Sequence, residues 1–114
     1  MIHLWLVTTM SKIAYKLFLD DERWPKTTDW MLVRSSHQAI NAVKLYGMPN
    51  EIAFDHDLGG SDTAMHFIWW MIDNHYDNDL EIPVDFKYTV HSQNPIGAAN
   101  IKHLMDGFLA DIGR

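Results

Sequence analysis

Apolar and polar positions alternate in blocks along the chain, and the blocks predict strands that alternate with helices. Residues 13–19 are apolar at nearly every position and stop at the acidic run 20–22, which is typical of a strand buried on both faces. Further strands are predicted at 30–34, 51–54 and 86–90. A loop at Trp24 and Pro25 separates the first two strands, because the residue before proline is driven out of the helical region.

Three helices are expected from the capping signals between these strands. A serine cap at 35–36 opens the first, and Gly47 ends it. The second begins at 61–62, and Asn94 followed by Pro95 opens the third. The positions expected to face the core are Met65, Ile68, Trp69, Ile72 and Tyr76 in the second helix, and Ile101, Leu104, Met105, Phe108 and Ile112 in the third.

This alternation predicts an α/β protein with a three-layer, doubly wound parallel sheet and helices on both faces. We expect a flavodoxin-like or receiver-like domain over residues 13–114, with strand order 2-1-3-4. Residues 1–12 are interpreted as a lead-in, an extra edge strand or an upstream start. Their apolar run 2–7 is too short to span a bilayer and lacks the features of a signal peptide.

Composition narrows the class of protein and of partner. The chain has 114 residues, 47% of them hydrophobic, which suits one domain with one core. It has no cysteine, which excludes disulfides and thiolate sites and permits a reducing, cytoplasmic location. The net charge of −6 argues against an extended nucleic-acid surface, because such binding draws on many phosphate contacts. We expect a small ligand, and no membrane.

Polar side chains follow three of the predicted strands. They are Asp20 and Asp21 after the first, Asp55, His56 and Asp57 after the third, and His91 and Ser92 after the fourth. In doubly wound folds the ligand binds at this edge of the sheet. With strand order 2-1-3-4, Asp20 or Asp21 faces Asp55, and the charges repel unless one carboxyl is protonated or a cation lies between them. Oxygen ligands favour Mg²⁺ or Mn²⁺.

Simpler roles compete for some of these residues. Asp57 precedes Leu58-Gly59-Gly60, and turn formation explains it as well as ligand binding does. Asn94 is better explained as a helix cap, although the start of that helix also offers N–H groups to an anion. The pair Trp69 and Trp70 is expected in the core. The convergence of Asp20, Asp55, His56 and His91 has no such explanation.

Three motifs resemble those of one family. They are Lys16-Leu17-Phe18-Leu19-Asp20-Asp21-Glu22-Arg23-Trp24-Pro25, Phe54-Asp55-His56-Asp57-Leu58-Gly59, and Val90-His91-Ser92-Gln93-Asn94-Pro95-Ile96-Gly97. In this order and spacing they resemble the cyclic-phosphate processing receiver domain, a receiver-like fold of bacteria and their phages. The resemblance implies action on cyclic phosphates, including 2′,3′-cyclic RNA ends. Residues 59–62 depart from the Gly-Thr-Gly-like turn of the family.

The resemblance also implies roles for individual residues. It carries over Asp20, Asp21, Asp55, His56, Asp57 and His91. Our hypothesis is a metal-dependent phosphoesterase, with the four aspartates as metal ligands and Asp55, His56 and His91 as catalytic groups. Arg23, Ser92 and Asn94 are candidate substrate-binding residues.

Two alternatives share the same pocket. One is a module that binds a cyclic nucleotide or a phosphorylated end without turnover. The other is a phosphoacceptor receiver in which Asp55 takes a phosphoryl group. That alternative calls for a fifth strand ending in a lysine, whereas Lys87 lies inside the fourth strand. We therefore rank it below phosphoester chemistry.

Overall fold

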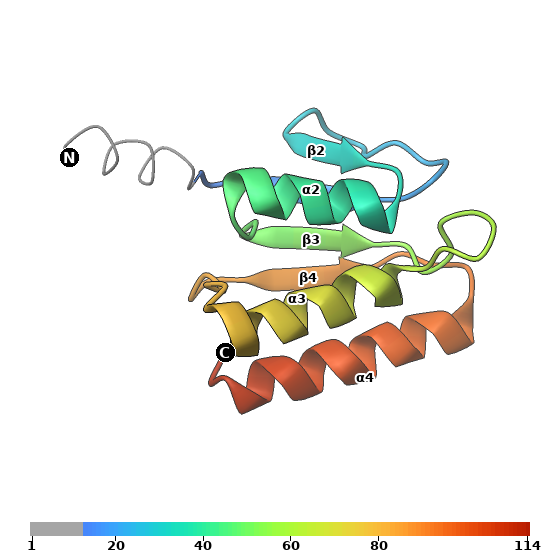
Figure 1. The fold of residues 1–114 in the computed structure, drawn as a ribbon. Coiled ribbons are helices and arrows are strands. Elements are labelled where there is room, and N and C mark those ends of the chain that lie inside the picture. Colours follow the sequence, from blue (N-terminus) through green and yellow to red (C-terminus); the bar gives the residue numbers. More distant parts are fainter. Residues whose placement is uncertain (1–12) are drawn as a thin grey trace.

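Within residues 13–114, four parallel strands form one sheet in the order β2-β1-β3-β4 (Figure 1). They are β1 (Lys16–Leu19), β2 (Trp30–Val33), β3 (Glu51–Phe54) and β4 (Lys87–Val90). This computed structural model describes residues 13–114, so the interpretations of residues 1–12 lie outside the described part. The receiver-like strand order predicted from the sequence is confirmed.

Three helices connect and follow the strands: α2 (Ser36–Tyr46), α3 (Ala64–Asn78) and α4 (Pro95–Asp111). The predicted caps of α2 and α4 are present. The Ser35 side chain accepts the N–H of Gln38, and Asn94 accepts the N–H of Gly97. The end of α2 at Gly47 has φ 81°, which favours glycine because it lacks a Cβ. None of the described helices is long and apolar enough to cross a membrane.

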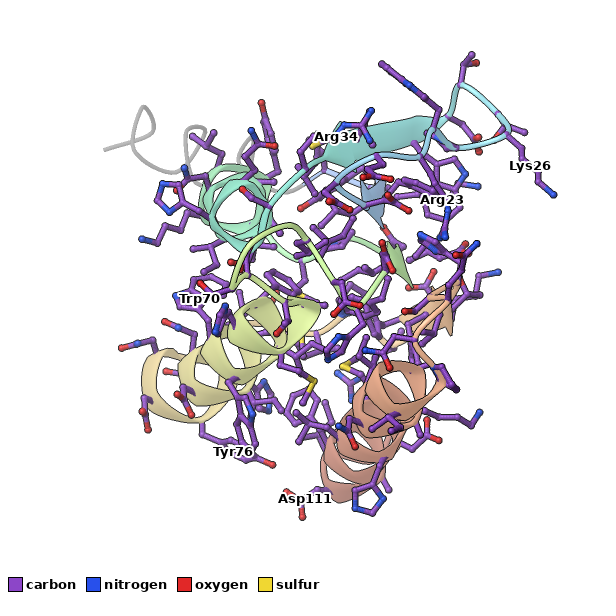
Figure 2. All side chains as sticks on the ribbon, turned by 90° about the vertical axis from the view of Figure 1, so that its right-hand side faces the viewer. Arg23, Lys26, Arg34, Trp70, Tyr76 and Asp111 are labelled. Atoms are coloured by element: carbon purple, nitrogen blue, oxygen red, sulfur yellow. The ribbon has the colours of Figure 1, made fainter. Side chains whose placement is uncertain are left out.

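All three helices pack on the same face of the sheet. Leu17 and Leu19 of β1 alternate with less buried neighbours, and their register partners on β3 are Ile52 and Phe54. These four side chains are fully buried in one apolar cluster that also takes in residues of all three helices. The strands therefore bury one face against a single helical layer (Figures 1 and 2).

The opposite face carries no helix within residues 13–114. We expected helices on both faces, but the connection that would supply one, residues 20–29 between β1 and β2, is a loop. Phe18 and Trp30 meet edge to face on this side and remain partly exposed. Lys16 pairs with Asp29 at 2.6 Å and lies over the Trp30 ring. The first strand is thus fully buried on one face only, contrary to its apolar pattern.

Helix α3 differs from its prediction in its start and in its inward face. It begins at Ala64 and not at 61–62, with Thr63 as an extended N-cap residue. The Asp62 carboxylate instead accepts the backbone N–H and the hydroxyl of Ser36 on α2. Trp69 and Tyr76 were expected to face the core and are instead about half exposed. Its buried residues are Ala64, Phe67, Ile68, Met71 and Ile72.

Candidate functional site

The carboxyl ends of β1 and β3 bring three aspartates together. Leu19 and Phe54 are register partners, so the next residues, Asp20 and Asp55, leave the sheet side by side. Asp20, Asp21 and Asp55 each offer a carboxylate oxygen, and these three atoms lie within 4.8 Å of one another. Figure 2 looks onto this edge of the sheet. Three hard oxygen donors this close fit the ligand chemistry of Mg²⁺ or Mn²⁺.

Asp20 is the most firmly held member of this group, at 1% exposure. Its Oδ1 accepts the backbone N–H groups of Glu22 and Arg23 at 2.9 and 2.8 Å, and its Oδ2 accepts from His91 Nε2 at 2.9 Å. Burial alone would raise the pKa of Asp20, but these hydrogen bonds together hold it below its ordinary value. The two backbone N–H groups use both lone pairs of Oδ1, and Oδ2 keeps one lone pair for a cation.

The pKa of Asp55 is shifted in the opposite direction to that of Asp20. It is 9% exposed, and the His56 backbone N–H donates to its Oδ1 at 2.8 Å. Burial and the nearby charge of Asp20 raise the pKa of Asp55, more than that hydrogen bond lowers it. A divalent cation between the two carboxylates would relieve this repulsion. The electrostatics therefore fit the predicted cation.

Asp57 does not join the three-carboxylate group, although the sequence predicts it as a fourth ligand. Its carboxylate is held by His56 Nδ1 at 2.9 Å and by Asn94 Nδ2 at 3.3 Å. The hydrogen bond from His56 lowers the pKa of Asp57. Asp57 thus ties the loop after β3 to the start of α4.

His91 connects the end of β4 to the end of β1. Its ring stacks on Phe18 with centroids 4.8 Å apart, on the face of the sheet without helices. Its carbonyl accepts from Arg23 Nη1 at 2.8 Å, and the same guanidinium lies 3.6 Å from the Asp20 carboxylate. His91 and Arg23 therefore both position Asp20.

A cleft of about 480 Å³ opens beside the aspartates. Its lining includes Asp21, Glu22, Arg23, Asp55, Asp57, Gly59, Gly60, Ser92, Gln93 and Asn94. All three predicted substrate-binding residues line it. The sequence prediction did not name Glu22 and Gln93, although both lie inside the quoted motifs. Neither His56 nor His91 lines the cleft. Its walls hold four acidic side chains and one arginine.

Comparison with known proteins identifies the family. Residues 15–107, most of the chain, match the model described as the cyclic-phosphate processing receiver domain. The chain belongs to this family. No curated protein and no solved structure matches it. The matched segment takes in every strand and every predicted site residue of this receiver domain.

One close contact in this cyclic-phosphate processing receiver domain was missed from the sequence. Gly97, in the first turn of α4, lies against the His56 ring, and a Cβ there would come within 2.4 Å of the ring. The glycine in the third motif is the signal that indicates such a close approach. It lets His56 reach Asp57.

The described residues 13–114 place no lysine where a phosphoacceptor site calls for one. Within residues 13–114 the sheet has four strands, and no lysine lines the cleft. Lys87 is the first residue of β4, at the other end of the strand, where it pairs with Glu51 at 3.7 Å. The described residues therefore offer no lysine to a phosphoryl group on Asp55.

Proposed function

We propose that the acidic cleft binds a cyclic phosphate together with a divalent cation and hydrolyses one of its phosphoester bonds. The observation that carries the proposal is the group Asp20, Asp21 and Asp55, in which Asp55 has a raised pKa. A buried carboxylate with a raised pKa beside two other carboxylates is a usual feature of metal and catalytic sites. Membership of a family associated with cyclic-phosphate processing supports the substrate class.

The charge of the cleft explains why a cation is part of the proposal. Its four acidic side chains would repel a phosphate, and Arg23 alone does not balance them. Asp20, Asp21 and Asp55 would hold Mg²⁺ or Mn²⁺, and the ion would neutralise their charge, polarise the phosphoryl oxygen and orient a water molecule. Arg23, Ser92 and Asn94 line the same cleft and provide hydrogen-bond donors for phosphate oxygens.

The reaction is a displacement at phosphorus. The water oxygen bonds to the phosphorus of a 2′,3′-cyclic phosphate, and the bond from phosphorus to one ribose oxygen breaks. One proton of the water ends on that ribose oxygen, and the other stays on the new phosphate oxygen or passes to solvent. The product is a ribose phosphate monoester with a free neighbouring hydroxyl. The chain's own residues hold the phosphate in line and carry the proton.

In this proposal each histidine ring is hydrogen-bonded to an aspartate carboxylate. His91 donates to Asp20, as an outer hydrogen bond orients a metal ligand. His56 pairs with Asp57, which lies outside the three-carboxylate group. Neither imidazole lines the cleft, and this favours a second candidate function, a module that binds the cyclic phosphate without hydrolysing it. The acid and base roles of His56 and His91 stay predictions.

Turnover tests the proposal directly. We would incubate the protein with 2′,3′-cyclic AMP in Mg²⁺, in Mn²⁺ and in EDTA, and resolve the products by chromatography. We expect metal-dependent ring opening that falls by about 100-fold or more in Asp55→Asn, the range for loss of one electrostatic catalytic group. Asp73→Asn is the matched control, because Asp73 is an exposed aspartate on α3.

The outcomes separate the two candidates. Ring opening lost in Asp55→Asn and kept in Asp73→Asn supports the phosphoesterase. No turnover by folded protein, with the intact nucleotide bound in calorimetry, rejects hydrolysis and supports the binding module. Neither turnover nor binding rejects both. A pH profile that loses a limb in His91→Gln or His56→Gln assigns that histidine a proton-transfer role.

A further inference from the structure

Trp24 is a large, exposed aromatic side chain in the loop that also supplies residues to the cleft. It lies in the β1–β2 loop directly after Arg23, which lines the cleft, and it is 74% exposed. An indole this exposed contributes little to the core, because an aromatic ring stabilises the fold mainly when it is buried. The loop that carries Asp21, Glu22 and Arg23 of the cleft thus also presents an exposed aromatic ring.

Arg34 holds this ring in place. Its guanidinium lies over one face of Trp24, 4.8 Å from the ring centroid. Its Nη1 donates to the carbonyl oxygens of Asp20 and Arg23 at 3.1 and 2.7 Å. The cation supporting Trp24 is therefore bonded to the backbone that carries the aspartate group. Arg23 and Arg34 both lie at the edge of the sheet that Figure 2 faces.

We infer that the free face of Trp24 stacks on the base of a nucleoside 2′,3′-cyclic phosphate whose phosphate occupies the cleft. This inference rests on the proposed function and adds a base-binding position to it. One face of the indole is taken by Arg34, and a neutral base can cover the other without adding charge to an acidic site. Stacking of this kind tolerates every base, because each has a π-face.

The test compares a nucleotide with a ligand that lacks the base. We would measure KM, or the dissociation constant where no turnover occurs, for 2′,3′-cyclic AMP and for methyl ribofuranoside 2′,3′-cyclic phosphate. The protein should prefer the nucleotide by about 10-fold or more, the usual size of one stacked base. In Trp24→Ala the ratio should fall to about one, and Trp24→Phe should restore part of it. Trp69→Ala, which removes another half-exposed tryptophan on α3, should keep the ratio.

Each result decides the inference separately from the proposed function. No preference in the unmodified protein, or an equal weakening of both ligands in Trp24→Ala, overturns base stacking while hydrolysis stands. Binding without turnover, with a preference that depends on Trp24, rejects hydrolysis while stacking stands. Failure to bind either ligand overturns both.

Discussion

Asp55 is the residue whose surroundings oppose its charge most clearly. Burial and the neighbouring Asp20 carboxylate raise its pKa, and the hydrogen bond from its own loop offsets this only in part. Asp20 faces the same repulsion but accepts three hydrogen bonds, so its pKa is lowered. Without a cation, Asp55 is therefore the member of the pair whose ionised form is disfavoured.

Replacing Asp55 by asparagine should stabilise the metal-free protein. A carboxyl with a raised pKa in the folded state destabilises the fold above that pKa, and its effect disappears as the pH falls below the unfolded value. In EDTA at pH 7 we expect Asp55→Asn to raise the free energy of unfolding by about 1 kcal/mol, the usual size of a single-residue effect. Urea unfolding at several pH values measures it.

The matched control is Asp57→Asn. The pKa of Asp57 is lowered by its hydrogen bond from His56, so its ionised form favours the fold and this variant should not be stabilised.

For Asp55→Asn the gain in the free energy of unfolding should shrink as the pH falls toward 4, where the wild-type carboxyl becomes protonated. A gain that is unchanged at pH 3 would show that charge repulsion is not its cause.

At the scale of elements, the β1–β2 loop depends on Arg34. Replacing it by lysine removes the planar fork that reaches two carbonyls and stacks on Trp24. We expect the amides of Glu22 and Arg23 to exchange about 10-fold faster, because a loosened loop opens locally more often. Hydrogen exchange measured by NMR reads this out.

Arg114→Lys is the control for the loop. Arg114 binds three carbonyls, those of Ile82, Pro83 and Ile112, none of which belongs to the β1–β2 loop. This substitution should leave the exchange of Glu22 and Arg23 unchanged. Equal protection of these amides in wild type and Arg34→Lys would contradict the role given to Arg34.

Helix α4 tests the contact between Gly97 and His56. A Cβ at Gly97 would meet the His56 ring at 2.4 Å, so Gly97→Ala should destabilise the protein by about 1–3 kcal/mol, as overpacking does. Gly107→Ala is the control in the same helix, since a Cβ there has nothing within 4 Å. Because alanine is the better helix former, Gly107→Ala should stabilise by about 0.5–1 kcal/mol.

Thermal unfolding of both glycine variants measures this difference, and NMR of the His56 ring shows whether it moves. If Gly97→Ala is as stable as Gly107→Ala and the ring signals are unchanged, the close contact does not constrain His56.

What could be predicted from the sequence follows from the geometry of parallel sheets. Strands of one sheet end at one edge, so the aspartates after β1 and β3 had to meet there. The inward face of α3 could not be fixed this way, because both sides of that helix carry large apolar residues. Trp69 was assigned to the core, and Phe67 and Met71 occupy it instead.

The contacts of the two histidine rings could not be predicted from the sequence either. The alternation of strands places His56 and His91 at the correct edge but does not say which partner each ring finds. That choice depends on Phe18 under one ring and Gly97 beside the other. Both contacts join segments far apart in the chain, and although the glycine of the third motif indicates a close approach, no local pattern names the partner.

For the whole molecule, the proposed cation should act as a stabilising ligand. An ion that binds only the folded state adds about 2.7 kcal/mol at a hundred times its dissociation constant. For a domain of this size that corresponds to a rise of about 10 °C in Tm. Calorimetry with increasing Mg²⁺, starting from protein treated with EDTA, measures the effect.

The net charge of −6 makes a control essential, because any salt screens repulsion in an acidic protein and stabilises it. KCl at matched ionic strength gives the screening contribution, and Asp55→Asn gives the same protein without a complete aspartate group. For wild type, we expect Mg²⁺ to raise the Tm well beyond the rise caused by KCl. For Asp55→Asn, we expect Mg²⁺ and KCl to raise the Tm by the same amount. Since Asp55→Asn is the more stable protein in EDTA, the order of the two should invert as Mg²⁺ rises. Parallel shifts without inversion would mean that the ion acts only on the overall charge.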